Sequence, residues 1–395
     1  MSEDVSLDAL REEMRNWLVE NAPRDWRAQY QERGQADFVR AQRAWFESLV
    51  EGGYAIPHWP KGWPGGGRSL AEQRVIYEEL ARADCPRLLL TFVSTYHAAS
   101  TLFKCGTEEQ KARHIPGILN GELWCQGFSE PNAGSDLASI RTRAELRGDK
   151  YIINGQKVWS TLAHHADWCL LLVRTSTDQV KQEGITFLLM NMRSKGVKVR
   201  PIKQIYGDSD FCEIFLDDVE IGVENRVGEE GKGWIIAQET LSSERGLTLM
   251  ELSYRVRHGL WRISQLIIDR GRQSDVGVLR KFGRLVTRVQ SACAVADDFL
   301  ARRIDGTEEV GDASIVKNTY SSVLRDYAWF GVRLGGLESQ YRSPVTLGDL
   351  NTGNWMADFM HSYAWSIAGG AEEIQRNIVA ERILQMQREP KTWTL

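Results

Sequence analysis

Two stretches decide the fold of this chain: they read QGFSEPNAGSD at residues 126–136 and YIINGQKVWST at residues 151–161. The Pro, Asn and Gly of the first stretch favour a tight loop, and hydroxyl and carboxylate side chains stand on it. The second stretch alternates apolar and polar residues around Asn154-Gly155, which predicts a hairpin turn. Past the turn, Trp159 and Thr161 are expected on one face of a strand, because side chains alternate along it. Such a pair could hold a flat ring with polar edges, or Trp159 could be an ordinary buried residue.

The composition argues against several classes of protein. The formal net charge is −4, from 49 basic and 53 acidic residues, and no basic cluster suggests a nucleic-acid partner. No apolar run approaches the length of a membrane span, and the acidic start Met1–Asp4 lacks the apolar region of a secretory signal. The six cysteines and seven histidines show no metal-ligand spacing, so no metal is expected. Reduced, buried thiols would fit a cytoplasmic protein.

The spacing of apolar residues predicts three successive domains in an α+β fold. Residues 1–120 show helical periodicity and are expected to form an all-helical domain. Residues 121–230 are expected to form a small β domain. Its strand-like runs are Tyr151–Ile153, Trp168–Val173, Thr186–Leu189, Val197–Ile202 and Cys212–Leu216. Residues 231–395 are expected to form a four-helix bundle, because helical periodicity returns there. Its predicted helices are Trp234–Arg272, Val276–Arg303, Asp312–Leu334 and Trp355–Gln387.

The two opening stretches, together with three others, resemble the signature regions of the acyl-CoA dehydrogenase family. The further stretches are CGTEEQK at 105–111, GEEGKGW at 228–234 and IQRNIVAER at 374–382. Each is moderately specific alone, and the set is highly specific in this order and spacing. The resemblance covers nearly the whole chain. It implies the family's α–β–α architecture, FAD as cofactor, an acyl-CoA substrate and an electron-transfer flavoprotein as electron acceptor. The early loop rich in Trp and Pro is similar to that of the branch found in steroid-degrading bacteria.

The resemblance implies that four residues of the two stretches hold the flavin: Phe128, Ser129, Trp159 and Thr161. Ser129 would bond the pyrimidine side of the ring, Thr161 would bond the N5 region, and Trp159 would pack against the ring. Hydrogen bonds and apolar cover of this kind tune the electronics of a flavin. Ser135 resembles the family residue that contacts the CoA portion of the substrate. For the two serines, simple capping of a turn is the alternative.

The subsite for the ADP half of FAD departs from the family pattern. In the family, an Arg of the bundle and a Gly-Gly segment hold this half across a subunit interface, and Arg270 and Gly335-Gly336 occupy those positions here. The family pattern R-x-x-F-G reads RGRQS, the expected Gln is Val332, and the expected Thr is Ala371. Each lost hydrogen bond costs about 1 kcal/mol. The divergence resembles the hetero-oligomeric enzymes of steroid-degrading bacteria, so an α2β2 tetramer with a homologous chain stands beside a homo-oligomer.

The resemblance offers two positions for the base that removes the α-proton. Many family members carry a Glu just before the last helix, where this chain has Gly369. A smaller set carries the base earlier in a Glu-Arg pair, which is Glu244-Arg245 here. Glu244 is therefore the expected base, with an exposed, ion-paired helix residue as the alternative, and Arg245 would hold CoA or the helix. Gly369 would polarise the thioester carbonyl through its N–H. Glu373 is expected to support the cofactor, and Glu372 to be solvated.

The expected function is FAD-dependent α,β-dehydrogenation of an acyl-CoA in lipid metabolism, with the proton taken by Glu244 and the hydride by flavin N5. Because Gly369 leaves room where a side chain usually stands, a bulky or steroid-derived acyl group is expected. Two alternatives remain open. The chain could be a non-catalytic subunit that completes the FAD or acyl-CoA site of a partner. It could also be a flavin oxidase or monooxygenase on the same fold.

Overall fold

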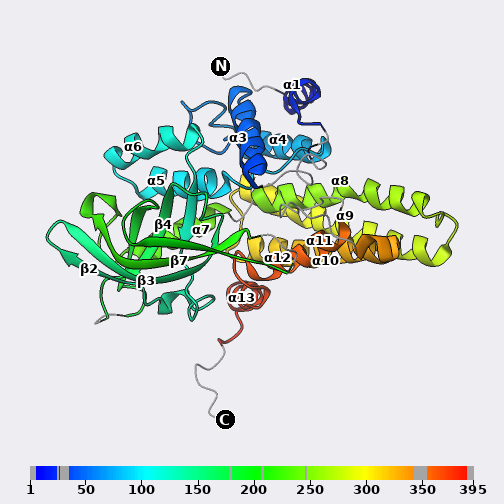
Figure 1. Cartoon of the computed structure of the whole chain (residues 1–395). Coiled ribbons are helices and arrows are strands. Elements are labelled where there is room, and N and C mark those ends of the chain that lie inside the picture. The colour runs from blue at the N-terminus through cyan, green and yellow to red at the C-terminus, as the bar shows by residue number, and fades with distance from the viewer. Residues whose placement is uncertain are drawn as a thin grey trace, which may run out of the picture.

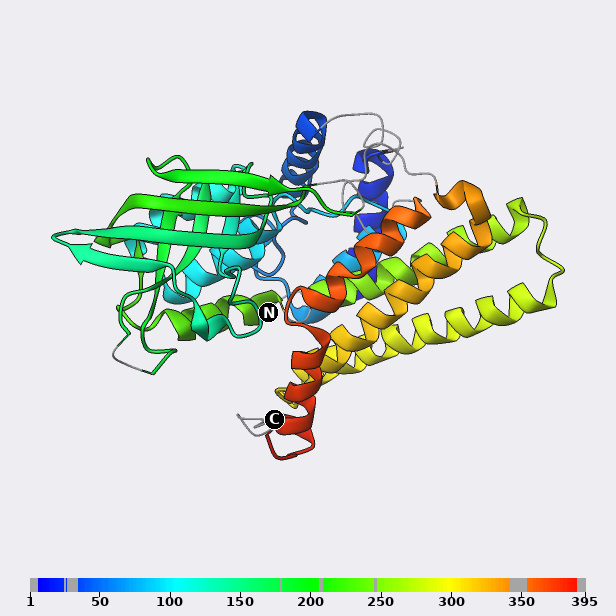
Figure 2. The same ribbon diagram turned by 60° about the horizontal axis from the view of Figure 1, so that its bottom comes forward.

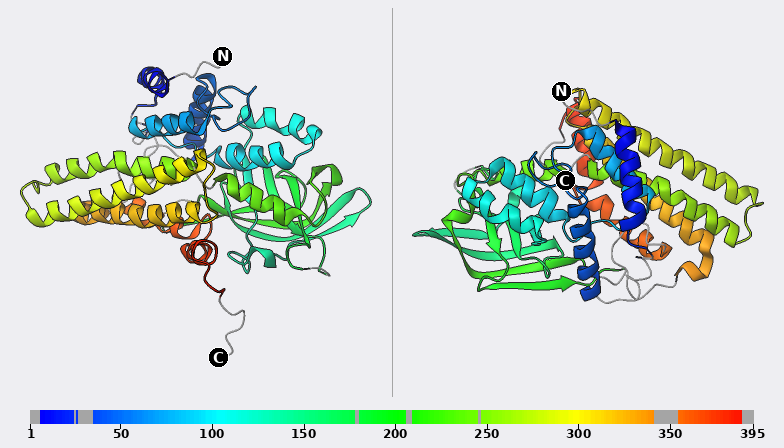
Figure 3. Two further views of the ribbon diagram at one scale, coloured as in Figure 1. Left: turned by 180° about the vertical axis from the view of Figure 1, so that it is seen from behind. Right: turned by 90° about the horizontal axis from the view of Figure 1, so that it is seen from above.

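The computed structural model describes residues 6–24, 26, 35–177, 180–205, 209–244, 247–340 and 354–388. Helices come first along the chain, a β-sheet follows, and long helices complete it (Figure 1). The sheet and the long helices lie next to each other, and the N-terminal helices lie across their junction (Figures 1 and 3). This arrangement confirms the predicted fold class.

The N-terminal part of the described chain is helical, and several of its helices begin at side-chain caps. They are α1 (Leu7–Asn21), α3 (Gln35–Glu51), α4 (Leu70–Arg82), the π-helical segment η1 (Val93–Ala98), α5 (Ala99–Cys105) and α6 (Glu108–Leu119). Ser69 and Glu72 form a reciprocal capping box at the start of α4, and Thr107 and Gln110 form another at the start of α6. Each box satisfies backbone N–H groups that the first turn of a helix leaves unpaired.

The strands form a sheet in the order β6-β7-β3-β2-β4-β5-β8, and β1 pairs with β4. Their bounds are β1 (Trp124–Gly127), β2 (Arg143–Arg147), β3 (Lys150–Thr161), β4 (Trp168–Arg174), β5 (Ile185–Asn191), β6 (Val197–Ile202), β7 (Phe211–Gly222) and β8 (Arg226–Val227). Strands β4 and β5 are buried on both faces, with N-terminal helices on one side and side chains of β3 and β7 on the other. The strand-like runs predicted from the sequence all lie in strands. Strands β1, β2 and β8 were not predicted, because they are short or rich in charge.

The predicted hairpin turn at Asn154-Gly155 is wrong. Strand β3 runs through both residues, and its hairpin with β2 closes earlier, at Gly148. The Asn154 side chain instead exchanges two hydrogen bonds with Asp218 of β7, at 2.8 and 2.9 Å. Gly155 stands at a β-bulge, where a Cβ would lie 2.5 Å from the hydroxyl oxygen of Thr142 and 2.7 Å from its Cα. Both turn-forming residues therefore lie inside one long strand, opposite a bulge at which β7 contributes one residue more than β3.

The C-terminal helices pack into a bundle (Figure 2). They are α7 (Gly233–Glu244), α8 (Leu247–Asp269), α9 (Val276–Ile304), α10 (Asp312–Gly335), η4 (Gly336–Gln340), α11 (Trp355–Ser362), α12 (Ala364–Ile367), α13 (Glu372–Ile378) and η5 (Val379–Ile383). Helices α8, α9, α10 and α11 share one apolar core. The helix predicted over 355–387 is interrupted, because Gly369 and Gly370 adopt left-handed backbone with φ of 65° and 89°. None of the helices within the described part of the chain combines the length and the apolar content that a bilayer crossing requires.

The bulge predicts a marked difference between two Gly→Ala substitutions. Gly155→Ala should lower the free energy of unfolding by about 1–3 kcal/mol, because the new methyl group meets the backbone of Thr142. Gly283→Ala is the control: it lies inside α9 with nothing within 4 Å of a Cβ, so it should be neutral or stabilise by up to about 1 kcal/mol. Urea unfolding of both variants measures the difference. Equal unfolding midpoints would contradict the close contact at the bulge.

Candidate functional site

A tight loop and the second half of strand β3 meet at one surface. The loop turns at Glu130 and Ala133, whose backbone groups exchange two hydrogen bonds of 3.0 Å. The backbone N–H of Val158 donates to the carbonyl oxygen of Ser129 at 2.9 Å, which joins the strand to the loop. The ring of Phe128 is buried and lies edge-on to Phe187, with 5.8 Å between ring centroids. Phe128 can therefore border this surface only with its backbone, while Ser129 is half-buried at the surface.

A fully buried ion pair fixes the loop against the strand. The Nζ of Lys157, which is 0 % exposed, donates to Glu130 Oε1 at 2.8 Å and to the carbonyl oxygen of Phe128 at 3.1 Å. The Glu130 carboxylate also accepts from the backbone N–H groups of Arg141 at 2.6 Å and Thr142 at 2.8 Å. The loop is thus tied at three points to the strand and to the chain that follows it.

In this pair, the charge of each group shifts the pKa of the other. Burial alone would raise the pKa of Glu130, but the charge of Lys157 and the hydrogen bonds hold it below its ordinary value of 4.5. Burial lowers the pKa of Lys157, and Glu130 offsets part of that effect. Sequence reasoning missed both residues, although each stands in one of the two opening stretches. A signal was present, since Lys157 follows Tyr151 and Ile153 along the buried face of the strand.

Trp159 points out of this strand. Its side chain is 59 % exposed, between the buried residues Val158 and Ser160, and its backbone is left-handed with φ of 63°. The register shifts by one residue between Lys157 and Ser160, so a second bulge turns the indole outward. The alternative of an ordinary buried Trp is therefore wrong. Thr161 is half-buried two residues further along.

The surface thus offers an open aromatic plane beside half-buried hydroxyl groups, which fits a flat ring with polar edges. The ring of Phe211 stands edge-on to Trp159 at 6.3 Å and borders this plane. Ser135 lies at the exposed end of the loop. The structure joins Ser129 of the loop to the strand next to Trp159, and the roles of Ser129, Ser135, Trp159 and Thr161 stay predictions.

The residues predicted for the ADP half of FAD meet at another place. Arg270 forms an ion pair with Glu338. Glu338 lies in η4, shortly after the Gly335-Gly336 segment. Helices α8 and α10 end on the side of the bundle that points away from the sheet (Figure 1). A groove of about 430 Å³ between α9 and α10 adjoins this end of the bundle. The cations that line the groove are Arg272, Lys281, Arg284, Arg288 and Arg333. Guanidinium groups of this kind suit phosphate oxygens.

Side chains of α10 and α13 fix the backbone of the loop between α12 and α13. The carbonyl oxygen of Gly369 accepts from Gln375 Nε2 at 2.9 Å, and that of Gly370 accepts from Lys317 Nζ at 2.7 Å. Gln375 and Lys317 are both buried, and the Gln375 amide oxygen accepts from the Ser314 hydroxyl at 2.6 Å. With these carbonyls engaged, the N–H of Gly369 donates to no acceptor among the residues that the structure describes. An unengaged N–H on an exposed, anchored glycine can bind an oxygen that comes from outside.

One of the two carboxylates after this loop differs from the prediction. Glu372, expected to be solvated, is only 8 % exposed, because α13 packs on α10; one of its oxygens accepts from Arg376 at 3.3 Å. Glu373 is exposed on the same helix. Glu244 ends α7, which packs on η1 and β5. The Glu244 side chain and the whole of Arg245 lie outside the described residues.

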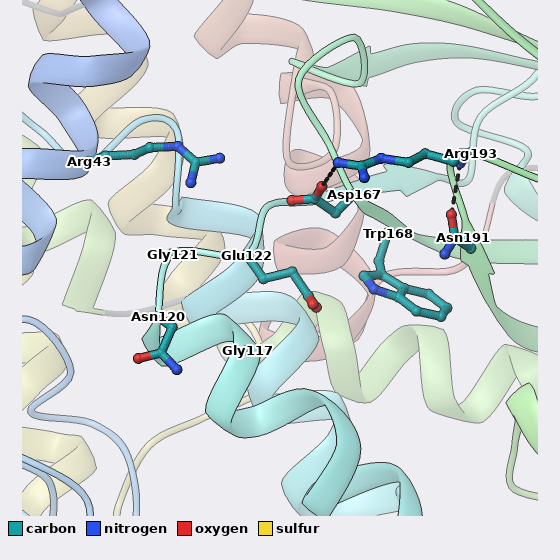
Figure 4. Close-up of a pocket in the computed structure, with 9 residues that line it drawn as sticks. All are labelled: Arg43, Gly117, Asn120, Gly121, Glu122, Asp167, Trp168, Asn191 and Arg193. Atoms are coloured by element: carbon teal, nitrogen blue, oxygen red, sulfur yellow. Dashed lines mark hydrogen bonds and ion pairs between the residues drawn. The ribbon is translucent and has the colours of Figure 1, made fainter.

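A surface cavity of about 420 Å³ lies elsewhere, between the end of α6 and the sheet (Figure 4). Its walls carry both signs of charge, and Arg193 pairs with Asp167 across it at 2.9 Å. Glu122 faces the cavity and accepts from the indole N–H of Trp124 at 3.0 Å. The cavity contains no residue of the predicted site, and its two carboxylates already have partners.

Comparisons with known proteins find relatives along nearly the whole chain. The family models "Acyl-CoA dehydrogenase, N-terminal domain", "middle domain" and "C-terminal domain" match residues 6–122, 125–219 and 231–384. Acyl-CoA dehydrogenase IpdE1 of Mycolicibacterium smegmatis is 34 % identical over 401 residues, which cover 98 % of this chain and 100 % of that protein. The IpdE1 protein of Mycobacterium tuberculosis is 34 % identical over 391 residues, with 98 % and 99 % covered.

Two solved structures share the whole fold. The Tcur3481-Tcur3483 steroid ACAD superposes with a TM-score of 0.83 at 28 % identity, covering 98 % of this chain and 99 % of that chain. The ChsE4-ChsE5 complex from Mycobacterium tuberculosis superposes with a TM-score of 0.80 at 26 % identity, covering 98 % and 100 %.

The buried ion pair predicts a pH-dependent loss of stability. Glu130→Gln should lower the free energy of unfolding at neutral pH by about 3–5 kcal/mol, because it leaves the charge of Lys157 buried without a counter-ion. Since the pKa of Glu130 is depressed in the folded state, its contribution is complete above pH 4.5 and is lost as the pH falls through the folded pKa. The difference in the free energy of unfolding between wild type and variant should therefore become smaller below that pH. Urea unfolding at a series of pH values measures this difference.

The control for this prediction is Glu145→Gln on β2. Glu145 pairs with Arg147 at 2.9 Å in an exposed position, so its loss should cost less than about 1 kcal/mol. A constant gap between wild type and Glu130→Gln down to acid unfolding would contradict the assigned role of the pair.

Proposed function

The chain belongs to the acyl-CoA dehydrogenase family, and we propose that it desaturates a bulky acyl-CoA thioester between Cα and Cβ with FAD as cofactor. The observation that carries the proposal is the outward-turned indole of Trp159, held beside Ser129 by a buried ion pair. An indole that left-handed backbone turns outward beside half-buried hydroxyl groups offers a face on which another flat group can stack. FAD supplies the acceptor for the hydride that leaves Cβ.

The flavin-facing residues have distinct roles in this proposal. Trp159 packs against the isoalloxazine, Ser129 and Thr161 donate hydrogen bonds to its polar edge, and Phe128 contributes its backbone. Ser135, exposed at the end of the loop, contacts the CoA portion of the substrate.

The ADP half of FAD would lie on a second subunit. Arg270 and the Gly335-Gly336 segment are proposed to hold it there, since the ion pair between Arg270 and Glu338 joins the two segments at one end of the bundle. The neighbouring cationic groove supports a diphosphate at this end. Glu373, exposed on α13, is proposed to support the cofactor.

The proton chemistry is assigned to residues near α7 and the Gly369 loop. Glu244 is the proposed base, and Arg245 would hold CoA or the helix end. The N–H of Gly369 donates to the thioester carbonyl and makes the α-proton more acidic. This role is supported by the anchored carbonyls of the loop, which leave that N–H for the substrate. Electrons then pass to an electron-transfer flavoprotein.

A homologous second chain completes the proposed assembly. Each of the two similar solved structures is named as a pair of proteins, Tcur3481-Tcur3483 and ChsE4-ChsE5. Together with the donors missing at Val332 and Ala371, this favours an α2β2 tetramer over a homo-oligomer. The first of these pairs is described as a steroid ACAD, which likewise supports a steroid-derived acyl group. The absent side chain at Gly369 leaves room for such a group.

The base assignment predicts a large kinetic effect at one carboxylate. Glu244→Gln should slow flavin bleaching by a ring-bearing acyl-CoA about 10²–10⁴-fold, because the amide cannot accept the α-proton, while bound FAD stays unchanged. Glu239→Gln makes the same charge change on the same helix, at an exposed ion pair with Lys104, and should change the rate less than about twofold. Anaerobic stopped-flow absorbance measures both rates. Wild-type bleaching by Glu244→Gln would remove the assignment.

The flavin surface predicts that Trp159→Ala separates cofactor binding from stability. Bound FAD should weaken by about three- to tenfold, because a stacked aromatic contact contributes about 0.5–1.5 kcal/mol. The unfolding midpoint should hardly change, since the indole is 59 % exposed and alanine keeps the Cβ in the left-handed backbone. Leu146→Ala, another exposed apolar residue of the sheet, should alter neither. Undiminished FAD affinity of Trp159→Ala by equilibrium titration would exclude the stacking role.

A further inference from the structure

Arg87 is a buried arginine that lacks a counter-ion. It is 7 % exposed, its Nε is buried without an acceptor, and no ion pair within the described residues includes it. Its guanidinium carbon lies 5.7 Å from the ring centroid of Trp365. A guanidinium stays charged in a protein, so it cannot escape the cost of burial by losing its proton. Burying an unpaired charge costs several kcal/mol, so an anion or a carbonyl oxygen from outside the described residues would stabilise it.

A second buried donor stands beside it. The indole Nε1 of Trp365 is buried and has no acceptor in the part of the chain that the structure describes. Indole N–H groups only donate, and guanidinium groups only donate. Two unengaged donors on neighbouring side chains call for the same kind of ligand atom, an oxygen with free lone pairs.

The loop that carries Arg87 is held in place. The carbonyl oxygen of Arg87 accepts from Gln42 Nε2 at 2.8 Å, and the same amide accepts from the backbone N–H of Leu90 at 3.2 Å. The carbonyl oxygen of Pro86 accepts from Trp45 Nε1 at 3.0 Å. Buried side chains of α3 therefore fix the backbone on both sides of Arg87. Its position is preorganised, as expected of a residue that binds a ligand.

The charge of Arg87 acts on two titratable groups, and neither supplies an anion. Burial raises the pKa of Tyr96 well above the ordinary value, so the phenol keeps its proton. Burial and the charge of Arg87 together lower the pKa of His361 to about 4, so the imidazole is neutral at pH 7. Glu251, whose charge also acts on Tyr96, pairs with Arg255, with 2.8 Å between their charged atoms.

Aromatic rings gather on the two sides of Arg87 that Trp365 and Tyr96 mark. Tyr96 stacks on His58 with 4.1 Å between ring centroids, and on Phe92 at 5.1 Å. The Tyr96 hydroxyl is hydrogen-bonded to that of Tyr77. Trp365 contributes the other aromatic face. Apolar walls with one charged point suit a large hydrocarbon body that carries an oxygen at one end.

Arg87 lies close to the chain that leads into the Gly369 loop. It faces the ring of Trp365, which belongs to α12, and α12 ends at Ile367, directly before that loop. An acyl group whose thioester is at Gly369 would therefore begin near the helix whose indole Arg87 faces.

We propose that Arg87, together with the indole N–H of Trp365, binds an oxygen of the acyl group remote from the thioester, either a ring ketone or a carboxylate. This inference rests on the proposed function and narrows its substrate class to cyclic acyl-CoA esters oxygenated at the far end. A purely hydrocarbon acyl group would leave both donors without partners. Sites built to bond a substrate oxygen reject analogues that lack it.

Three CoA esters of equal length test the inference: 3-cyclohexylpropanoyl-CoA with a methyl, keto or carboxyl group at ring carbon 4. The FAD-loaded protein, with its partner chain when co-purified, is titrated with each ester by calorimetry, and flavin bleaching is recorded separately. Wild type should bind the keto or carboxyl ester at least about tenfold more tightly than the methyl ester. The preferred of the two identifies the native oxygen. Equal dissociation constants for all three esters would overturn the inference without any variant.

Variants separate binding from a structural role. Arg87→Met keeps the length and apolar volume of the side chain and should abolish the preference, while Arg87→Lys should keep part of it for the carboxyl ester. Arg262→Met is the control, because Arg262 is also largely buried but pairs with Asp84; it should leave the preference unchanged. An unchanged preference in Arg87→Met would overturn the inference. A preference without flavin bleaching would support the inference and contradict the proposed dehydrogenation, whereas bleaching without a preference would do the reverse.

Discussion

The ammonium group of Lys157, which has no access to solvent, is the constraint on which the site depends. Among the residues that the structure describes, only Glu130 forms an ion pair with it, and the backbone N–H groups of Arg141 and Thr142 fix that carboxylate in turn. If the loop moved away from the strand, the ion pair would break before water reached either charge. The motion therefore costs free energy. The same ammonium holds the carbonyl oxygen of Phe128. The loop and the bulged strand therefore keep one register, and the surface they share is rigid before any ligand arrives.

Buried cations play different parts in this protein according to their partners. Lys157 meets a carboxylate and builds a scaffold, and Lys317 meets the carbonyl oxygen of Gly370 and shapes a loop. Arg87 meets the ring of Trp365 and has no counter-ion among the described residues, and we assign its charge to a ligand. Burying each of these cations costs free energy. For Lys157 and Lys317, the partners within the chain offset this free energy. For Arg87, we infer that an oxygen of the substrate offsets this free energy. A substrate that lacks this oxygen would then bind less tightly, which makes the site specific.

The sequence predicted the regular parts of the fold, because alternating and helical periodicities are local properties. It failed where a distant partner decides the outcome. Asn154 has the strongest local tendency to turn, yet its side chain bonds Asp218 of β7 and remains inside a strand. Glu372 begins a helix as acidic residues often do, but packing against α10 buries it. The predicted flavin residues came together because they lie in two short motifs. Arg87 carried no signal, since its burial depends on helices more than 200 residues later.

One measurement separates the two roles of the ion pair, as a source of stability and as the device that positions the loop. A double variant, Glu130→Gln with Lys157→Met, removes both charges and keeps one acceptor oxygen where Glu130 uses two, for the backbone N–H groups of Arg141 and Thr142. Its unfolding midpoint should lie closer to that of wild type than the midpoint of Glu130→Gln does, because no buried charge remains unpaired. Its ratio of bound FAD to chain should nevertheless stay well below the wild-type ratio, since the hydrogen bond to Phe128 is gone. A stable double variant with the full wild-type FAD content would contradict the account.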